Sequence, residues 1–544
     1  MQIRLRTIIL KSIVYALFLT GSMAYSVETA VNPDLQENFT IIVSSHNYDL
    51  NPHTASYSAE AQLLTGLYEG LFTYDPITLD PVPAIAESYR ISRDKKRWTF
   101  ILRENAKFSD GTSILANDIV QSWLRLIANP NASYSSLFDI VQGAADFRTG
   151  RSDSSKVGIY ASDDHTVSVH LTAPASHLPK LLCMPAFSAV KEDLSIFSGP
   201  FIFSEIKDSS FIFIKNEQYY DSAKVPLKQI TIMLSSDENE NTFAYNTGTA
   251  DWVTSAFKTD NLLAKDSVQL CAEFATQYFF FRLRDNIWKN KNLRAAILES
   301  VPWDELRANS YVSATTLVYP LAGYPIPQGY VYTDKHEAEL LLSEAKKSLG
   351  IDKTERLSLK FAVPDGEYMI KKAELLKSAW AEIGVDLEII KIPDNEYLSK
   401  ITTTDADLFT YTWIGDFADP LAFLELFRGG STMNVSNWAN AEYDSLLDQS
   451  ALYTDSTHSE LLSKAEQILL DEAVILPIQH PVSVNVINLN AVGGWALNAF
   501  DIHPLKYLFR RETKTQIPDI AMLMRVPRLT EDFKKVRFCR YSCL

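Results

Sequence analysis

Two strand-like segments with a long helical segment between them constrain the fold of this chain more than any other feature. Residues 357–363 (LSLKFAV) and 385–392 (VDLEIIKI) are rich in apolar β-formers, and residues 367–383 carry apolar side chains at helical spacing. A helix between two strands is typical of a βαβ unit, whose strands pair in parallel. The sequence therefore predicts an α/β protein with a partly parallel sheet.

Strands and helices alternate along the rest of the chain, and no internal repeat is present. Further strands are expected at residues 39–44, 98–102, 166–171, 228–234 and 410–413, with a hairpin over 198–216; further helices are expected at 59–67, 117–128, 293–300, 336–348, 441–452 and 460–470. A chain of 544 residues with 46% apolar content is too long for one core. We expect two or three domains.

The first 26 residues have the layout of a cleavable secretory signal. A basic start (residues 4–11) is followed by an apolar stretch (13–24) that ends in small residues. No cysteine precedes Cys183, so no lipid anchor on an N-terminal cysteine is expected, and no later segment has the length of a membrane span. Export predicts a periplasmic protein that is not a lipoprotein. Cys183 and Cys271 could pair there or remain two separate buried thiols.

Charge and motifs exclude several functions. The formal net charge of −16 argues against nucleic acid or an anionic membrane as partner. The sequence has no nucleophile elbow, phosphate loop, dinucleotide-binding turn or paired-ligand metal motif. His46 and His53 flank one loop, but with no third ligand nearby a surface loop is expected rather than a metal site. We predict a protein that is not an enzyme and that has no cofactor or metal.

Residues 410–420 (TYTWIGDFADP) combine a strand, a glycine and two carboxylates. Gly415 ends the strand, and Asp419 fits the N-cap of a helix whose first residue is Pro420. That assignment leaves Asp416 without a structural duty, in a turn between a glycine and an aromatic residue. Such a carboxylate suits a small cation, although a solvated turn is the simpler interpretation of this segment alone. The helix that follows is expected to end at RGGS, with Gly429 left-handed.

A series of motifs appears in a fixed order along the chain. The longest is residues 98–123 (WTFILRENAKFSDGTSILANDIVQSW); others include LNPHTA (50–55), LYEGLF (67–72), PVPAIAES (81–88), TGTADW (247–252), AWAEIGVDLEI (379–389) and MNVSNW (433–438). The series resembles the oligopeptide-binding (OppA-like) branch of the family 5 solute-binding proteins, which serve peptide and nickel ABC importers. NASYSSL (131–137) and WIGDFADP (413–420) favour the oligopeptide branch. The resemblance ends near residue 510.

The resemblance implies a bilobal periplasmic-binding-protein (type II) clamp with an additional third domain. By analogy the parts are a signal peptide at 1–26, lobe I at 27–66, 190–285 and 480–510, the additional domain at 67–189, lobe II at 286–479, and a basic C-terminal tail at 511–544. The tail lies beyond the family's end, and we expect it to be disordered.

The resemblance also implies a ligand site in the cleft between the lobes. Asp416 would pair with the α-ammonium group of a peptide whose backbone adds as a strand, with Trp413, Gly415, Phe417 and Asn434 around it. The implied partners are oligopeptides and an inner-membrane ABC permease, and the binding protein is expected to be a monomer. Two alternatives stay open: a dedicated binder of one ligand (murein tripeptide, dipeptide, haem or nickel chelate), and the same fold used as a sensor or chaperone.

Two departures from the family bear on this site. Thr410 stands where some peptide binders carry an Arg that meets the carboxylate of a short peptide, which puts length selection by that route in doubt. Arg282 and Arg284 replace the usual Asn-rich entry to the second lobe. They could be new carboxylate anchors, but solvated strand-end arginines are expected.

Overall fold

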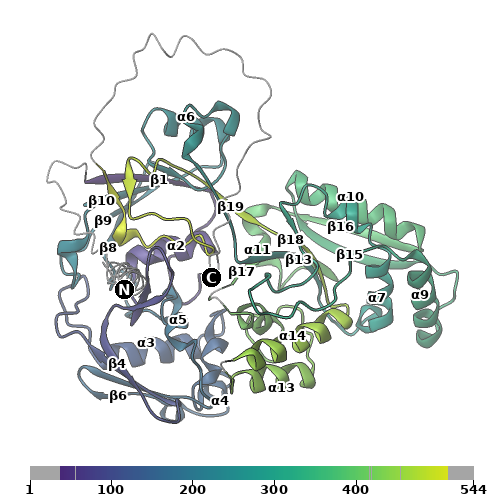
Figure 1. Cartoon of the computed structure of the whole chain (residues 1–544), viewed down its shortest axis with the longest axis horizontal. Helices are drawn as coiled ribbons and strands as arrows, with labels where there is room; N and C mark the ends of the chain where they lie inside the picture. The colour runs from purple at the N-terminus through teal and green to yellow at the C-terminus, as the bar shows by residue number, and fades with distance from the viewer. Residues whose placement is uncertain (1–36, 56, 416, 418, 454, 512–544) are drawn as a thin grey trace, which may run out of the picture. The chain divides into compact units, whose positions relative to one another are not determined.

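The structure, a computed structural model, describes residues 37–511 except 56, 416, 418 and 454 (Figure 1). The predicted signal segment and the tail from residue 512 lie outside these residues. No helix in the described ranges is long and apolar enough to cross a membrane.

The predicted βαβ unit is present in a six-stranded sheet. β15 (Leu357–Pro364) and β16 (Val385–Ile392) pair in parallel, and α10 (Glu367–Glu382) connects them. The strand order is β14 (Val312–Ser313), β18 (Ile475–His480), β13 (Ala275–Phe281), β17 (Leu408–Ile414), β15 and β16. Alternate residues of β15 enter an apolar core shared with α10, α7 (Lys291–Glu299) and α9 (Lys335–Leu349). The period-2 pattern therefore buries one face of this sheet.

A seven-stranded sheet collects strands from both ends of the chain. Its order is β12 (Val268–Ala272), β19 (Val482–Ile487), β11 (Trp252–Val253), β1 (Asn38–Val43), β10 (Gln229–Leu234), β9 (Ser210–Lys215) and β8 (Phe201–Lys207). β1 is parallel to both β10 and β11, and β8 and β9 form the predicted hairpin. The core on this sheet includes side chains of α2 (Ser58–Leu67).

A four-stranded antiparallel sheet holds the longest sequence motif. Its order is β4 (Ala86–Ile91), β5 (Arg97–Leu102), β7 (Thr166–His170) and β6 (Ile159–Asp163). The alternation of β5 buries Trp98, Phe100 and Leu102, and α3 (Ala116–Ala128) adds the fully buried Trp123 to the same core. The alternating apolar residues of the motif therefore form the buried face of this sheet.

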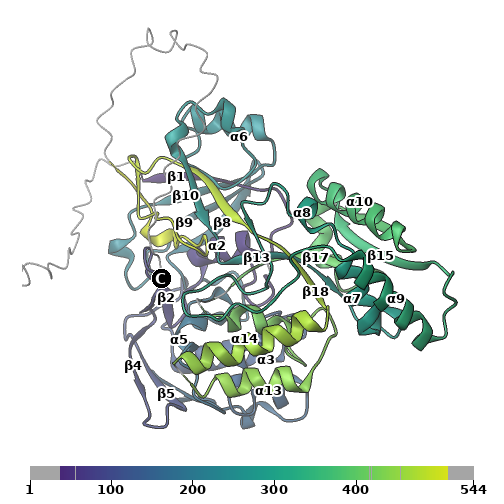
Figure 2. The same cartoon turned by 45° about the vertical axis from the view of Figure 1, so that its right-hand side comes forward.

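Two chain segments connect the seven-stranded sheet to the six-stranded sheet. One leads from β12 to β13 through residues 273–274, and the other from β18 to β19 through Pro481. The segments lie side by side, because the N–H of Glu273 donates to the carbonyl of Pro481 (3.1 Å). Figure 2 shows β13 and β18, the strands of the six-stranded sheet that directly follow and precede these connections.

Two further strand pairs and eight α-helices complete the strands and α-helices of the described residues. They are the strand pairs β2 (Phe72–Tyr74) with β3 (Pro81–Pro83) and β20 (Val492–Gly493) with β21 (Phe509–Arg510), and the helices α4 (Ala144–Arg148), α5 (Leu178–Leu181), α6 (Glu238–Asn246), α8 (Trp303–Leu306), α11 (Tyr397–Lys400), α12 (Leu421–Leu424), α13 (Ala441–Ser450) and α14 (Ser456–Asp471).

The histidine prediction was wrong about the environment of the loop. His53 is only 6% exposed, and the His46 ring stacks on Tyr48 with 3.7 Å between centroids. Burial, followed by the charge of Arg125, lowers the pKa of His53 to about 4, so this imidazole is neutral. Among the described residues no group of three or more His, Cys, Asp and Glu could hold a metal. No disulfide joins Cys183 to Cys271.

The expectation of solvated arginines was wrong for Arg282, whereas the side chain of Arg284 is 31% exposed. Arg282 is 6% exposed, and its guanidinium lies 4.3 Å from the Phe409 ring centroid. Arg284 pairs with Asp405 (2.5 Å) and donates to Asp407 (3.5 Å). Both side chains bind the segment that precedes β17. The sequence could not reveal this, because that segment lies far along the chain.

Candidate ligand-binding site

β17 is paired along one edge but only partly along the other. Residues 408–414 pair with β13, whereas β15 pairs with β17 only as far as Phe409. The main chain of Thr410 faces the second edge, because its N–H donates to the Tyr397 hydroxyl (2.9 Å) and its carbonyl lies 3.1 Å from that hydroxyl. Alternate residues of an antiparallel strand face the same edge. The main chain of Thr412 therefore faces it too, where no other described strand is paired; we name residues 410–414 the open edge of β17.

Gly415 ends β17 at a place where a side chain does not fit. Its N–H donates to the carbonyl of Phe274 (2.8 Å), and an added Cβ would lie 2.4 Å from that residue's ring. Phe274 belongs to the connection between the two sheets. The end of β17 is therefore held directly against this connection.

Trp413 is fixed by both its ring and its polar group. The residue is 8% exposed, its indole N–H donates to the carbonyl of Ala422 (2.9 Å), and its ring stacks on Tyr411 at 6.0 Å between centroids. With the N–H already used, Trp413 offers a ligand an aromatic surface rather than a hydrogen-bond donor.

The turn after Gly415 is held on both sides of Asp416, which itself lies outside the described residues. Phe417 is buried and stacks on the ring of His177, with centroids 5.3 Å apart and an interplanar angle of 10°. Asp419 accepts the N–H of Leu421 (2.9 Å), as expected of a capping residue, although the helix begins at Leu421 rather than at Pro420.

His458 of α14 also holds Asp419, and its hydrogen bonds require a charged imidazole. Nε2 lies 3.0 and 3.2 Å from the two carboxylate oxygens of Asp419, and Nδ1 lies 2.9 Å from the carbonyl of Ser450. Both neighbours are acceptors, so both ring nitrogens must carry protons. Burial alone would lower the pKa of His458, but the hydrogen bond and charge of Asp419 outweigh it and raise the pKa. An ion pair thus fixes this turn to α14.

Asn434 organises its own loop. Its amide donates to the carbonyls of Arg428 (3.1 Å) and Trp438 (2.8 Å), and its Oδ1 accepts from the hydroxyl and the N–H of Ser436. These bonds occupy both donors of the side-chain amide. Asn434 is not among the residues that line the cavity described next.

A cavity of about 180 Å³ lies beside the open edge of β17. Segments that lie far apart in the sequence surround it. The lining residues are Pro52, Ala55, Tyr57, Ser58, Ala61, Leu64, Tyr74, Tyr134, Met184, Pro185, Ala186, Leu398, Tyr411, Thr412, Trp413, Ile414, Gly415, Phe500 and Ile502. Trp413 and Gly415 of the predicted site are among them, and Phe417 is not.

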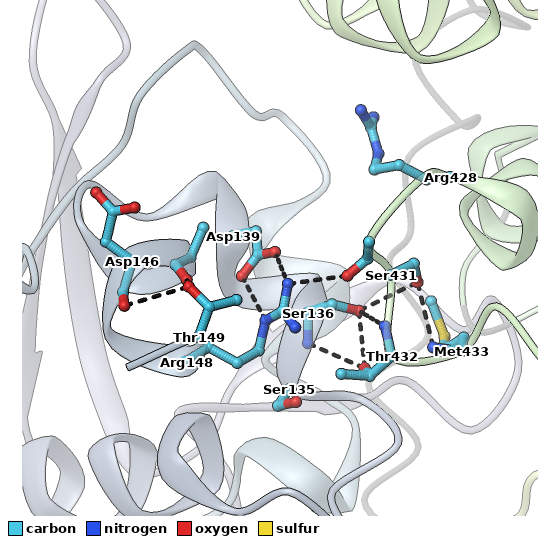
Figure 3. Close-up of polar contacts among 12 residues, drawn as sticks. Ser135, Ser136, Asp139, Asp146, Arg148, Thr149, Arg428, Ser431, Thr432 and Met433 are labelled. Atoms are coloured by element: carbon cyan, nitrogen blue, oxygen red, sulfur yellow. Dashed lines mark hydrogen bonds and ion pairs between the residues drawn. The ribbon is translucent and has the colours of Figure 1, made fainter. Parts of the chain in front are cut away.

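Thr432 joins the loop after α12 to the region around η1 (Ser135–Ile140), as Figure 3 shows. Its hydroxyl donates to the carbonyl of Ser133 (2.5 Å), and its N–H donates to Oγ of Ser136 (3.1 Å). The N–H of Ser136 is 3.4 Å from the Thr432 hydroxyl. We name these bonds the Ser136–Thr432 contact.

Arg148 adds a charged bond beside this contact (Figure 3). One of its nitrogens donates to the carbonyl of Gly430 (3.0 Å), while the same guanidinium pairs with Asp139 (Nε to Oδ1, 3.0 Å). Gly430, and not Gly429 as predicted, has the left-handed conformation (φ +81°). Gly429 is required for space instead, because an added Cβ would lie 2.6 Å from an oxygen of Asp444.

Sequence reasoning missed most of the cavity wall. Tyr57, Tyr74 and Phe500 carry no local pattern that marks them, since only the folded chain brings them together. Tyr134 and Ser136 do lie in NASYSSL, one of the motifs that favoured the oligopeptide branch. That motif was the available signal for this side of the cavity.

The sequence profile of the bacterial extracellular solute-binding proteins, family 5 Middle, matches residues 80–435. The matched span includes the four-stranded sheet, β13, the βαβ unit, β17 and the loop that carries Thr432. The chain belongs to this family. Family 5 proteins are binding proteins, and the described residues contain the sheets of two α/β lobes joined by two connections, with a further sheet that holds β4 to β7. The predicted type II clamp is confirmed, while the residue boundaries of its domains stay a prediction.

Individual relatives cover most of this family 5 protein. It is 28% identical over 447 residues to the dipeptide-binding protein DppE of Bacillus subtilis, covering 76% of this chain and 81% of the relative. It is 28% identical over 473 residues to the oligopeptide-binding protein OppA of the same organism, covering 80% and 86%. The structure of Listeria monocytogenes OppA bound to peptide superposes with a TM-score of 0.74 at 25% identity and covers 88% of this chain and 100% of that one.

Proposed function

We propose that this protein captures peptides at the open edge of β17 and delivers them to an ABC permease. The observation that carries the proposal is the position of the cavity beside an unpaired stretch of strand. A peptide backbone can add to such an edge through main-chain hydrogen bonds, which do not depend on sequence, while its side chains enter adjacent pockets. DppE and the two OppA proteins, whose names specify peptide ligands, support this assignment.

Asp416 is proposed as the partner of the peptide's α-ammonium group. It follows Gly415, which lines the cavity, and its turn is anchored through Phe417 and Asp419. A buried ammonium needs a matching charge, and loss of one partner of such a pair costs about 3–5 kcal/mol, or about 10²–10³-fold or more in affinity. Trp413 and Gly415 would contact the ligand.

Phe417 and Asn434 are proposed to support the site without lining the cavity. Phe417 would hold the Asp416 turn through its stack on His177, and Asn434 would hold the loop next to Thr432. The first contact holds the chain that follows Gly415, and the second holds the loop that carries Thr432. Substitutions at either residue are therefore expected to weaken binding through altered loop positions.

The proposed cellular setting rests on the predicted N-terminal signal. Cleavage near residue 26 would release a monomeric protein into the periplasm, without a lipid anchor, where it would meet the inner-membrane permease. A ligand that touches both lobes only when the cleft is shut would favour the closed state, which the permease can then distinguish from the open one.

Native mass spectrometry of protein purified without refolding tests the function. We expect a ladder of bound masses that fit short peptides, lost in Asp416→Ala and kept in the control Asp386→Ala, whose carboxylate forms an exposed ion pair with Arg356. A single sharp mass would indicate one dedicated ligand instead. Protein that carries nothing and that no member of a peptide library stabilises in a thermal-shift screen would refute peptide binding.

A further inference from the structure

The cavity beside β17 has no charged wall among the described residues. None of its lining residues is Asp, Glu, Lys, Arg or His. Thr410, where an Arg would supply a positive charge, is 4% exposed, and its main chain is tied to Tyr397. An anionic group of a ligand would therefore find no counter-charge here.

Arginines on neighbouring elements are already committed to other partners. Arg428 forms a bidentate pair with Glu425 (2.7 and 2.8 Å), and Arg148 pairs with Asp139. Arg282 lies on an aromatic ring and donates to main-chain carbonyls. A shift of any of these side chains toward the cavity would break existing charged bonds, which are the stronger class of hydrogen bond.

Aromatic rings form much of the wall. Tyr57, Tyr134 and Phe500 come from separate segments and line the same cavity as Tyr411 and Trp413 of β17. Aromatic pairs gain stability beyond the area that they bury. Ala55, Ala61, Leu64, Ile414 and Ile502 complete an apolar surface that favours a hydrophobic side chain.

The size of the cavity fits one side chain. Its volume is about 180 Å³, below the roughly 300–1,000 Å³ of sites that enclose a whole small molecule. A single large side chain, aromatic or aliphatic, would fill most of it and displace its water.

We propose that this cavity selects peptides with one large uncharged side chain and discriminates against acidic peptides. The proposal rests on the peptide-binding function given above and specifies its ligand class. Because a desolvated carboxylate without a partner is costly, an acidic side chain at the selected position weakens binding by about 100-fold or more relative to Phe.

Calorimetric titration with tripeptides tests the selectivity. Three sets place Phe, Leu, Asp or Lys at each position in turn, with Ala elsewhere. We expect one position at which Phe and Leu bind about 100-fold more tightly than Asp. If no tripeptide in any set binds, the peptide-binding function itself is in doubt. If all bind with similar affinity, the function stands and the selectivity is wrong.

Two variants locate the selection in this cavity. Ala61→Leu fills it from α2 with a good helix former and should weaken Phe peptides but not all-Ala peptides, whereas Ala59→Leu on the same helix lies outside the lining and should change neither. Thr412→Arg, at an exposed lining position, should tighten binding of the acidic peptide by about tenfold. Unchanged Phe affinity in Ala61→Leu, together with unchanged Asp affinity in Thr412→Arg, would overturn the proposal.

Discussion

Thr432→Val should weaken ligand binding by opening the Ser136–Thr432 contact without disturbing the cavity. The substitution keeps the size and the branched Cβ of Thr432 but removes its hydroxyl. The hydroxyl that is lost lies 2.5 Å from the carbonyl of Ser133 and 2.9 Å from Oγ of Ser136, and it accepts the long bond from the N–H of Ser136 (3.4 Å). Its single proton serves only one of the first two oxygens at a time, so one donated and one accepted bond are counted. At about 0.5–1.5 kcal/mol for each neutral hydrogen bond, with the long bond at the low end, the change amounts to about 1–2 kcal/mol.

This free energy acts on the closed state. Ser133 and Ser136 lie in the predicted additional domain and Thr432 in predicted lobe II, so we expect the contact to exist only when the cleft is shut. A ligand that requires the closed state binds with an affinity reduced by the fraction of protein that can close. We therefore expect the Kd to rise about 5–30-fold in Thr432→Val, mainly through faster dissociation.

Calorimetry and stopped-flow dissociation measure both quantities on one peptide. Thr432→Ser keeps the hydroxyl and should retain near-native affinity, which separates the hydrogen bonds from the side-chain methyl group. Arg151→Ala removes an exposed ion pair with Asp146 that does not cross to the Thr432 loop, and it should have no effect. The reasoning is refuted if Thr432→Val binds like the native protein, or if Thr432→Ser is as weak as Thr432→Val.

Two further predictions concern the turn that carries Asp416. Because the pKa of His458 is raised in the folded protein, its stabilising contribution is full below the ordinary value of about 6.5 and is lost as pH rises through the raised value. As the pH rises through that range, the free energy of unfolding measured in urea should fall by about 1–2 kcal/mol more for the native protein than for His458→Gln. If the free energies of the two proteins change with pH in parallel, the ion pair with Asp419 is contradicted. Gly415→Ala should lower the thermal midpoint and the peptide affinity together, since its Cβ would press on Phe274; a native midpoint would show that the ring moves freely.

The elements that the sequence predicted are those whose type is determined by a pattern of residues within the segment itself. β15, α10 and β16 were predicted because the alternation and the helical spacing are each repeated several times within one segment. Gly415 was predicted to end its strand because a glycine there interrupts a run of β-formers. The structure adds the reason, a ring placed where its Cβ would be.

The features that the sequence did not predict depend on segments far away in the chain. Arg282 is buried because Phe409 and the carbonyls of residues 402 and 404 meet it, and none of these is near it in sequence. Gly430 rather than Gly429 is left-handed in a loop where Asp444 and Arg148 both bind. Local preference allowed either glycine, and tertiary contacts decided between them.

The open edge of β17 also limits how much of a peptide can pair with it. At its inner end, the Tyr397 hydroxyl already binds the main chain of Thr410, and at its outer end Gly415 turns toward Phe274. The edge from Thr410 to Ile414 spans about 13 Å at about 3.3 Å per residue, so Thr412 and Ile414 are the residues left to bind a ligand's main chain. A long peptide would gain no further strand pairing here, and the cavity accepts a single large side chain. We therefore expect the co-purified ladder of masses to be dominated by short peptides; a ladder dominated by long ones would mean that binding energy comes from surfaces outside this edge.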